Sequence, residues 1–507
     1  MKRSLVAVSI VVALGAVWTG ASWYTGKQLE SRLDRFIEKT NIELKNSAPE
    51  SGFEWQAKDF KRGIFSSDVR LILTTKGGMK EVGIKPNEEI IFKSTIDHGP
   101  FPISNLKTFS LVPKMASIHS ELEKSDALKE LFNFTDGKSL FRADTNVGYS
   151  GSLSANIDFI PINYTKINKN GDHRVLSFAG AKISANTDRN LSVFSFTAKS
   201  EELSFSDPAK KETISLKGID FKGDNKKGNF DTYVGDQSYS VGEFSINGIP
   251  NEPNISLKGI KITTNSHEDK ENLNIKVTSS IDGVKIKDIE LGSGKLELGL
   301  EKLDGQSVRK FNQAYNDARQ KTLTVDGLSN DMTSYTILSN LHLLLNKNPQ
   351  FSISPFKWKN SEGESSVDFR LSLQNIPEDK NTVYRMEPEE MIRSLVKDLS
   401  LNINIPKAML IESIAQANEL DGKDKAATKI EVEQQVQAVV RNGSKFITNK
   451  NGVIGLNFHY ANDKVKLNDK ESSLHQFLLD NSLAESYDDA DGEESQHDNE
   501  SELPATE

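Results

Sequence analysis

The chain contains no cysteine among its 507 residues. This absence excludes disulfide bonds, thiol nucleophiles and cysteine-ligated zinc or iron–sulfur centres. Histidine is scarce as well, and the eight histidines never recur at the H-x-x-x-H spacing that would place two imidazoles on one metal. The G-x-S-x-G and phosphate-loop patterns are also missing. We therefore expect no catalytic residues, no cofactor-binding residues, no metal site and no cofactor.

The chain also has no excess of basic over acidic residues. The 63 Lys and Arg residues face 72 Asp and Glu residues, which gives a net charge of −9. Ten of the carboxylates lie within residues 485–507, where no Lys or Arg occurs, so residues 1–484 carry a net charge of +1. A neutral body lacks the basic footprint that a phosphate backbone requires, and this argues against nucleic-acid binding. We expect the tail to be disordered, and the alternative is an acidic arm for a basic partner or cations.

An uncharged stretch opens the chain. Leu5 to Tyr24 is long enough to cross the hydrocarbon core of a bilayer, so residues 1–26 are predicted to be a transmembrane anchor in contact with lipid. Lys2 and Arg3 precede it and place the N-terminus in the cytoplasm, with the bulk of the chain in the periplasm. Aromatic residues cluster at its outer end, as in a retained anchor. The alternative is a secretory signal peptide cleaved before Ser22.

Residues 27–51 continue with the spacing of an amphipathic helix. Its apolar side chains are Leu29, Leu33, Phe36, Ile37 and Leu44. This stripe predicts either a helix packed on its own domain or pairing with a second copy, which would make the protein a homodimer.

Residues 52–304 have the alternation of strands. Val69, Leu71 and Leu73, for example, alternate with their neighbours in the way expected for a sheet with one apolar and one water-facing side. The region predicts an antiparallel β-rich periplasmic domain.

An internal repeat lies within this region. Its full copies lie at residues 176–183, 214–221 and 255–262, and shorter copies lie at residues 244–249 and 281–286. In the full copies apolar residues occupy positions one, three, six and eight, whereas a flat strand needs one, three, five and seven. An inserted residue with Gly at the special position would keep both apolar pairs on one face. The repeat therefore predicts a curved meander with recurrent glycine bulges at Gly180, Gly218 and Gly259. The alternative is that the glycines mark ordinary hairpin turns.

The pattern of apolar residues changes after residue 304, where helical spacing appears between the strand-like segments. Residues 305–484 therefore predict a mixed α+β periplasmic domain. We expect helices near 308–318, 332–345, 388–397, 408–420, 426–440 and 472–479, with Ser307 able to cap the first of them. Strands are expected near 351–353, 366–373, 399–405, 452–460 and 464–467. The predicted fold class is thus mainly β with an α+β C-terminal part, in which the meander packs with the C-terminal helices.

Two short segments contain residues that suggest special roles. Asp97-His98-Gly99-Pro100-Phe101-Pro102 places a His beside a carboxylate, as in a general base, but adjacent residues on an extended chain point to opposite faces. We therefore interpret it as a rigid strand exit. The segment 292–294, Gly-Ser-Gly, is predicted to be a turn between strands at 284–291 and 296–300.

Several blocks resemble the YdgA family of Gram-negative inner-membrane proteins. They are residues 1–8 with 17–20, 62–67, 97–102, 148–151, 291–296 and 358–361. The resemblance runs to about residue 470 and implies an inner-membrane protein with a large periplasmic part, a dimer as one option, and a domain of unknown function. It implies no catalytic residue, and the acidic tail departs from the family pattern.

These observations favour a non-enzymatic, single-pass envelope protein. Its one-sided sheet would either pack on the C-terminal helices or form a groove for a lipid, another apolar ligand or a protein partner. The segment 336–345 is apolar on more than one side, so it is expected to be deeply buried or to cover such a groove. The rival interpretation is an envelope hydrolase or modifying enzyme whose site the sequence does not show.

Overall fold

A computed structural model gives the fold of the chain. It describes residues 2–47, 52–76, 85–107, 109–167, 173–324, 338–345, 347–374, 376–377, 385–441, 446–481 and 483. Side chains are described for all of these except 2–16, 43, 46–47 and 319–324. The predicted tail, 485–507, lies outside the described residues.

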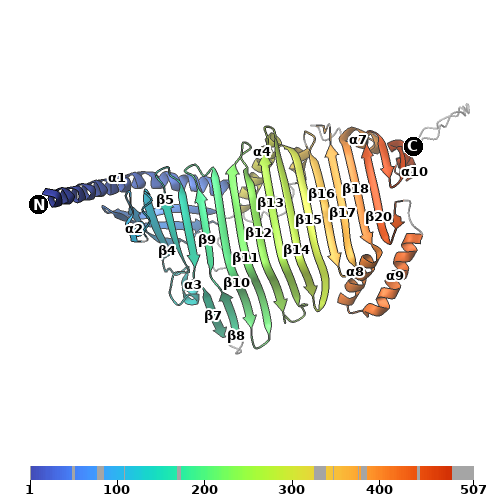
Figure 1. The fold of residues 1–507 in the computed structure, drawn as a ribbon, viewed down its shortest axis with the longest axis horizontal. Coiled ribbons are helices and arrows are strands. Elements are labelled where there is room, and N and C mark those ends of the chain that lie inside the picture. Colours follow the sequence, from blue (N-terminus) through green and yellow to red (C-terminus); the bar gives the residue numbers. More distant parts are fainter. Residues whose placement is uncertain are drawn as a thin grey trace, which may run out of the picture.

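One antiparallel sheet dominates the described part of the chain and contains 22 strands there (Figure 1). The strands are β1 (Phe53–Arg62), β2 (Ser66–Thr75), β3 (Ile90–His98), β4 (Ala116–Leu122), β5 (Phe141–Val147), β6 (Leu153–Phe159), β7 (Ile162–Ile167), β8 (His173–Phe178), β9 (Ala181–Thr187), β10 (Val193–Asp207), β11 (Glu212–Lys227), β12 (Tyr233–Asn247), β13 (Ile255–Glu268), β14 (Asn272–Ile286), β15 (Ile289–Asp304), β16 (Gln350–Asn360), β17 (Gly363–Leu373), β18 (Val396–Pro406), β19 (Thr448–Lys450), β20 (Val453–Ala461), β21 (Lys464–Leu467) and β22 (Lys470–Ser473). The mainly β fold class with an antiparallel sheet is therefore confirmed.

Helices occur at the two ends and along one edge of this sheet. They are α1 (Lys2–Ser47), α2 (Ile103–Lys107), α3 (Lys129–Phe134), α4 (Gly305–Thr324), the 3₁₀ helix η3 (Leu341–Leu345), α7 (Pro388–Leu395), α8 (Lys407–Leu420), α9 (Lys425–Arg441) and α10 (Leu474–Asp480). The expected boundary at residue 304 falls inside the sheet, because β15 pairs with β16 across it. The change in sequence pattern at this point corresponds to helix α4, which is inserted between β15 and β16. The sheet itself continues across the boundary.

The repeated glycines lie in a line that crosses the sheet. Gly218 and Gly259 have φ angles of 65° and 61°, and Gly180, between β8 and β9, has 86°. Each of these glycines lacks a paired residue on the neighbouring strand. The pairs on either side of it nevertheless keep the same register, as in Lys217↔Glu243 and Ile219↔Val241. The opposing strand therefore omits a residue at the same level. The positions omitted at this level, in order across the strands, are Gly180, Glu201, Gly218, Gly242, Gly259 and Asp282, and between β13 and β14 the ladder also omits Ile260 and Ile281.

This line has a direct effect on the faces of the sheet. Since each of the strands β10 to β14 shifts its alternation by one residue at the same level, the apolar side chains before and after the line point to the same side. Leu216 and Ile219 on β11 illustrate this, with Phe244 and Val241 opposite them on β12. The positive φ angles agree with the predicted special role of the glycines, while the matched omission on both strands differs from a simple bulge on one strand.

The helix α1 packs on the first strands of its own chain. Leu29 is buried in a cluster with Val69, Ile96 and Met115, and Leu33 packs against that cluster. Asn41 exchanges two hydrogen bonds with the backbone of Trp55, at 2.8 and 2.9 Å. The apolar stripe predicted for residues 27–51 thus faces the chain's own sheet.

The predicted transmembrane segment lies mostly outside the residues whose side chains are described. Among the described residues, no helix contains an apolar stretch that would span a bilayer.

Three local expectations differ from the structure. Asp304, and not Ser307, caps α4, because its carboxylate accepts a hydrogen bond from the Ser307 N–H at 2.9 Å. The segment 292–294 lies inside β15 and the chain turns earlier, at Lys287, whose φ is 54°. Most of the predicted helix 332–345 lies outside the described residues, and its end, Leu341–Leu345, is a 3₁₀ helix. Leu338, three residues before this 3₁₀ helix, is 70% exposed, so the expectation of deep burial is wrong for this residue, while the alternative that the segment covers a groove stays a prediction.

Candidate ligand-binding site: the apolar face of the sheet

Rows of apolar side chains cross the sheet from strand to strand. Two of them illustrate the arrangement. One row joins Leu203, Leu216, Phe244, Leu257 and Val284 on β10 to β14. Another joins Leu296, Phe356, Val367, Ile403 and Leu456 on β15 to β20. Residues directly opposite each other on one face are close enough to pack, so each row forms an apolar band. The side of the sheet that carries these bands is here called the apolar face.

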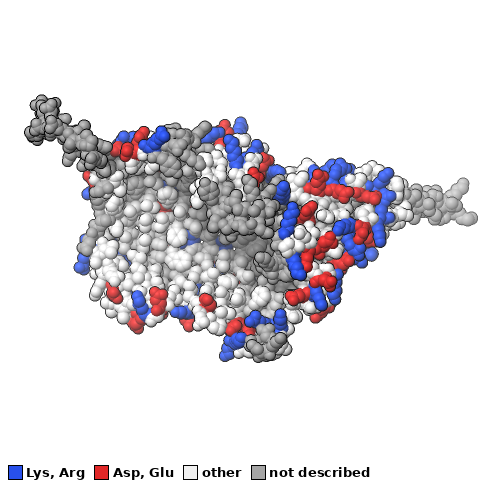
Figure 2. Space-filling model, turned by 180° about the vertical axis from the view of Figure 1, so that it is seen from behind, with Lys and Arg blue, Asp and Glu red and all other residues white. Residues whose placement is uncertain are grey.

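The middle of the apolar face is open to solvent. Its members Phe194, Phe205, Ile214, Ile262, Leu298, Leu300 and Phe356 are each between 36% and 53% exposed. Figure 2, seen from the reverse side, shows a broad area with few charged side chains, bordered below by Lys, Arg, Asp and Glu. Contiguous exposed apolar patches of this kind are rare on soluble monomers and mark interaction sites.

Helices close the ends of this face. At one edge α4 contributes Val308 to a cluster with Val234, Leu273 and Leu303. At the C-terminal end α10 packs Leu474 and Leu478 against Tyr460, and α8 and α9 join Ile411 to Val432 and Val436. The described helices therefore cover the ends of the apolar face and leave its middle strands exposed.

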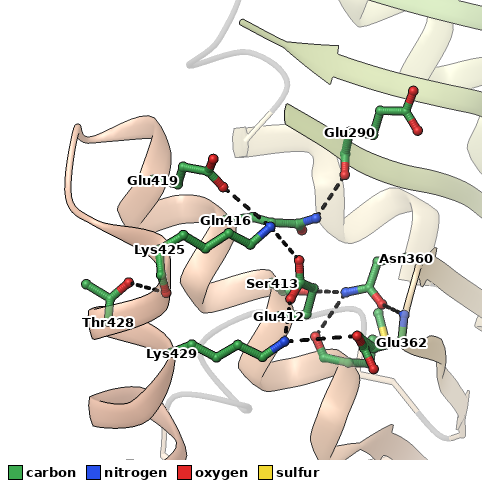
Figure 3. A network of polar contacts seen from close by, with 11 residues as sticks. Glu290, Asn360, Glu362, Glu412, Ser413, Gln416, Glu419, Lys425, Thr428 and Lys429 are labelled. Atoms are coloured by element: carbon green, nitrogen blue, oxygen red, sulfur yellow. Dashed lines mark hydrogen bonds and ion pairs between the residues drawn. The ribbon is translucent and has the colours of Figure 1, made fainter. Parts of the chain in front are cut away.

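A polar network fastens α8 and α9 to the sheet (Figure 3). The buried Glu412 carboxylate pairs with Lys425 at 2.8 Å and with Lys429 at 3.0 Å. Burial raises the pKa of Glu412, but the two ammonium groups outweigh it and hold that pKa below its usual value. Asn360 donates to the Met409 carbonyl at 3.0 Å, and Gln416 donates to the Glu290 carbonyl at 2.8 Å. Each of these polar side chains is engaged in a contact that holds α8 and α9 in place.

The opposite face of the sheet is polar. Ion pairs bridge neighbouring strands there, for example Lys199 with Asp220 at 3.0 Å and Lys357 with Glu364 at 2.7 Å. A polar pocket on this side is lined by Lys276, Glu297 and Arg370, together with serines, and contains no histidine. Lys276 and Lys295 each lie 2.7 Å from Glu297, and their hydrogen bonds lower its pKa. Such mutual neutralisation is typical of a water-facing sheet surface.

No group of residues suited to a metal ion occurs among the described residues. The sequence had singled out one ionisable pair, Asp97 and His98, and the structure separates the two. The Asp97 carboxylate accepts from the Ser104 N–H at 2.9 Å and so starts α2. The His98 side chain is buried against α1, where Nδ1 donates to the Ser22 carbonyl at 2.9 Å. The two side chains therefore serve different contacts, as expected for a rigid strand exit.

The burial of His98 changes its acid–base behaviour. Desolvation lowers the pKa of the imidazole, and it outweighs the Ser22 hydrogen bond and the Asp97 charge, both of which would raise it. Nε2 lies 3.0 Å from the Ser67 hydroxyl, which can donate to it. A neutral ring in this position joins α1 to β2 and β3.

Sequence reasoning could not foresee this contact. Ser22 and His98 are separated by 76 positions, and nothing in the local pattern around either residue specifies the other. The available signal was the small size of Ser22 and Gly26 on one face of α1, which permits close approach of another segment.

Comparison with known proteins gives related chains of similar length. The chain is 32% identical over 491 residues to "Protein YdgA" of Escherichia coli (strain K12), covering 94% of this chain and 96% of that protein. It is 25% identical to "Uncharacterized protein YihF" of the same strain, covering 93% of this chain and 97% of that protein. An "Uncharacterized protein" of Haemophilus influenzae is 24% identical, with 61% of this chain and 85% of the relative covered. No solved structure matches the chain.

A family profile also matches nearly the full chain. It spans residues 1–475 and is described as "Bacterial protein of unknown function (DUF945)". This match, together with the likeness to YdgA, confirms the resemblance of the sequence blocks. The chain belongs to the DUF945 family of bacterial proteins of unknown function.

Proposed function

We propose that this protein is a non-enzymatic envelope protein that binds lipid acyl chains on the apolar face. One observation carries the proposal: the apolar rows are aligned over many strands, yet their central members are partly exposed. An apolar ligand would remove that surface from water at a gain of roughly 25 cal/mol per Å². The polar opposite face gives the sheet a water-compatible side.

The dimensions of the apolar face suit a hydrocarbon chain. From β10 to β20 the neighbouring strands extend for about 43 Å at a spacing of about 4.8 Å. The hydrocarbon part of one bilayer leaflet is about 15 Å thick, half of a core of about 30 Å. The face is thus long enough for at least one extended acyl chain that lies across the strands.

We place the protein in the bacterial inner membrane, with Leu5–Tyr24 as a single span, the N-terminus in the cytoplasm and the bulk in the periplasm. The uncharged stretch, its basic flank and the outer aromatic residues support this location. Alkaline phosphatase fused to the C-terminus of the full chain should be active, and carbonate washing should leave the protein in the membrane. Release of a form that begins at Ser22 would contradict the anchor.

A hydrolase would instead need a polar cleft in which ionisable groups converge. In the pocket lined by Lys276, Glu297, Glu301 and Arg370, the Glu297 carboxylate is neutralised by Lys276 and Lys295. This pairing leaves Glu297 without the character of a free general base.

Two neighbouring residues on β13 allow a matched test. Ile262 belongs to the apolar face and is 41% exposed, while Thr263 points to the opposite side. We expect mass spectrometry of gently extracted protein to detect phospholipid with the wild type and with Thr263→Glu. Ile262→Glu, which adds the same charge on the apolar side, should reduce the bound lipid severalfold. Equal lipid content in both variants, or none in the wild type, would contradict the proposal.

A further inference from the structure

Two loops at one end of the sheet lie beside α1. Residues 63–65 connect β1 to β2, and residues 99–115 connect β3 to β4. Because successive antiparallel strands reverse direction, these two connections emerge at the same end. Figure 1 shows α2, which belongs to the second loop, at the end where α1 extends beyond the strands.

Both loops expose large apolar side chains. Phe109 is 92% exposed, Leu111 70%, Val112 62% and Ile64 53%. Exposed apolar residues are ordinary when scattered, but here three lie within four positions of a single loop.

The second loop is held in place by its own hydrogen bonds. The Ser110 N–H donates to the Asn105 carbonyl at 2.9 Å, and the Lys114 N–H donates to the Pro100 carbonyl at 3.1 Å. The Asn105 side chain donates to that of Asn146 at 3.1 Å. The apolar side chains are therefore displayed on a fixed scaffold.

Trp18 of α1 contacts both loops. Its indole N–H donates to the Phe101 carbonyl at 3.3 Å, and its ring lies 4.9 Å from the ring of Phe65, measured between centroids. The chain thus fixes the two loops at the level of Trp18 along the helix.

That level sets the depth of the loops in a membrane. If the span is Leu5–Tyr24, Trp18 lies six residues inside its outer end, which is about 9 Å at 1.5 Å per residue. Elements that lie in the membrane interface enter by about 5–10 Å. Loops fixed beside Trp18 would therefore reach the boundary between headgroups and acyl chains.

The cations near this end fit the same boundary. Lys27 and Arg62 lie over the ring of Trp23, at 5.8 and 5.7 Å from its centroid. Lys107 and Lys114 flank the apolar part of the second loop. Long basic side chains beside aromatic residues are typical of the headgroup level, where the stem is apolar and the charge meets phosphate.

From this arrangement we infer that Ile64, Phe109, Leu111 and Val112 form a second membrane contact, which inserts into the outer leaflet of the bilayer around α1. The inference rests on the proposed anchor and adds a fixed orientation: the sheet is held with its first strands against the lipid surface. The partner is a phospholipid surface, and the loops would not engage a separate protein.

Because the chain has no cysteine, an introduced cysteine is the one thiol that a fluorophore can label. The full chain with Leu111→Cys or Ile64→Cys is labelled with an environment-sensitive fluorophore. It is then reconstituted into vesicles of phosphatidylethanolamine and phosphatidylglycerol, with or without brominated acyl chains. Val17→Cys in α1 reports on the anchor, and Asp421→Cys, exposed in the turn between α8 and α9, is the distant control.

We expect brominated lipid to quench the labels at positions 17, 64 and 111 at least twofold, and to leave position 421 unchanged. Quenching at position 17 with positions 64 and 111 as unaffected as 421 would overturn the loop contact and leave the anchor in place. No quenching at position 17 would overturn the anchor and the loop contact together.

Discussion

The imidazole of His98 lies so close to Gly26 that a Cβ atom on Gly26 would be 2.6 Å from Cε1 of the ring. Glycine is therefore required at this point of α1, and the requirement comes from space, since the residue is helical. Together with the Ser22 hydrogen bond, this contact fixes α1 on β2 and β3. The orientation of the sheet relative to the helix depends on it.

Replacing Gly26 with Ala should weaken this joint. The extra methyl group must displace the His98 ring, and overpacking of this kind costs about 1–3 kcal/mol. Gly20→Ala is the matched control, because outside the backbone of its own helix its added Cβ would meet nothing within 4 Å. That variant should be neutral or stabilising, since Ala favours a helix over Gly by about 1 kcal/mol. Thermal unfolding followed by circular dichroism measures both, and equal melting temperatures would refute the close packing.

His98 should also make the stability depend on pH. Its pKa in the folded protein lies below the 6.5 of an unperturbed imidazole. The unfolded chain therefore binds the proton more readily, and acid favours unfolding. The stabilisation is fully present above pH 6.5 and is lost as the pH falls through the folded pKa.

The variant His98→Gln lacks this titration. The difference in unfolding free energy between wild type and variant, measured by urea denaturation, should shrink as the pH is lowered from 7.5 to 5. Asp97 and Arg62, the charges that act on His98, are present in both proteins and cancel in the comparison. A difference that stays constant over this range would show that His98 titrates normally.

Alanine substitutions at two glycines without a ladder partner, Gly218 and Gly259, should reduce the stability of the protein by different amounts. Gly218→Ala should cost about 1–2 kcal/mol, because its positive φ angle disfavours a Cβ atom. Gly259→Ala should cost about 1 kcal/mol more, because its Cβ would also overlap the carboxylate of Asp282.

Combining Gly259→Ala with Asp282→Gly should remove that added cost in a double-mutant cycle. Lys261→Val, on the water-facing side, should change stability by less than about 0.5 kcal/mol. Equal costs at Gly218, Gly259 and Lys261 in chemical denaturation would mean that the glycines serve only as turn residues.

Local periodicity predicted the elements better than their assembly. The helices near 408–420 and 426–440 correspond to α8 and α9, and the strand expected at 464–467 is β21. These segments could be predicted because each has the repeat of its own element and a breaker at its end.

Long-range contacts account for the errors. The segment 292–294 looked like a turn because glycine is common in turns. In the structure Gly294 provides room for the ring of Trp358, whose N–H donates to the Leu291 carbonyl from 67 positions away. Similarly, Asp304 became the cap of α4 because β15 extends to that residue, a limit set by pairing with β14.

The candidate site shows the same division. The spacing of apolar residues around Gly218 and Gly259 predicted a one-sided sheet, and the register of β10 to β14 agrees with it. Which part of that side would be covered could not be predicted. It depends on where α4, α8 and α10 pack, and those positions are set by tertiary contacts such as Val308 with Leu303.

Site-specific photo-crosslinking from β13 tests the central claim most directly. A benzophenone amino acid is introduced at position 262, on the apolar face, or at position 261, on the polar face, and the protein is irradiated in native membranes. Both positions are exposed, so only the face differs. The account predicts a phospholipid adduct from position 262 and none from position 261. Adducts of equal yield from both positions, or from neither, would contradict binding of acyl chains by the apolar face.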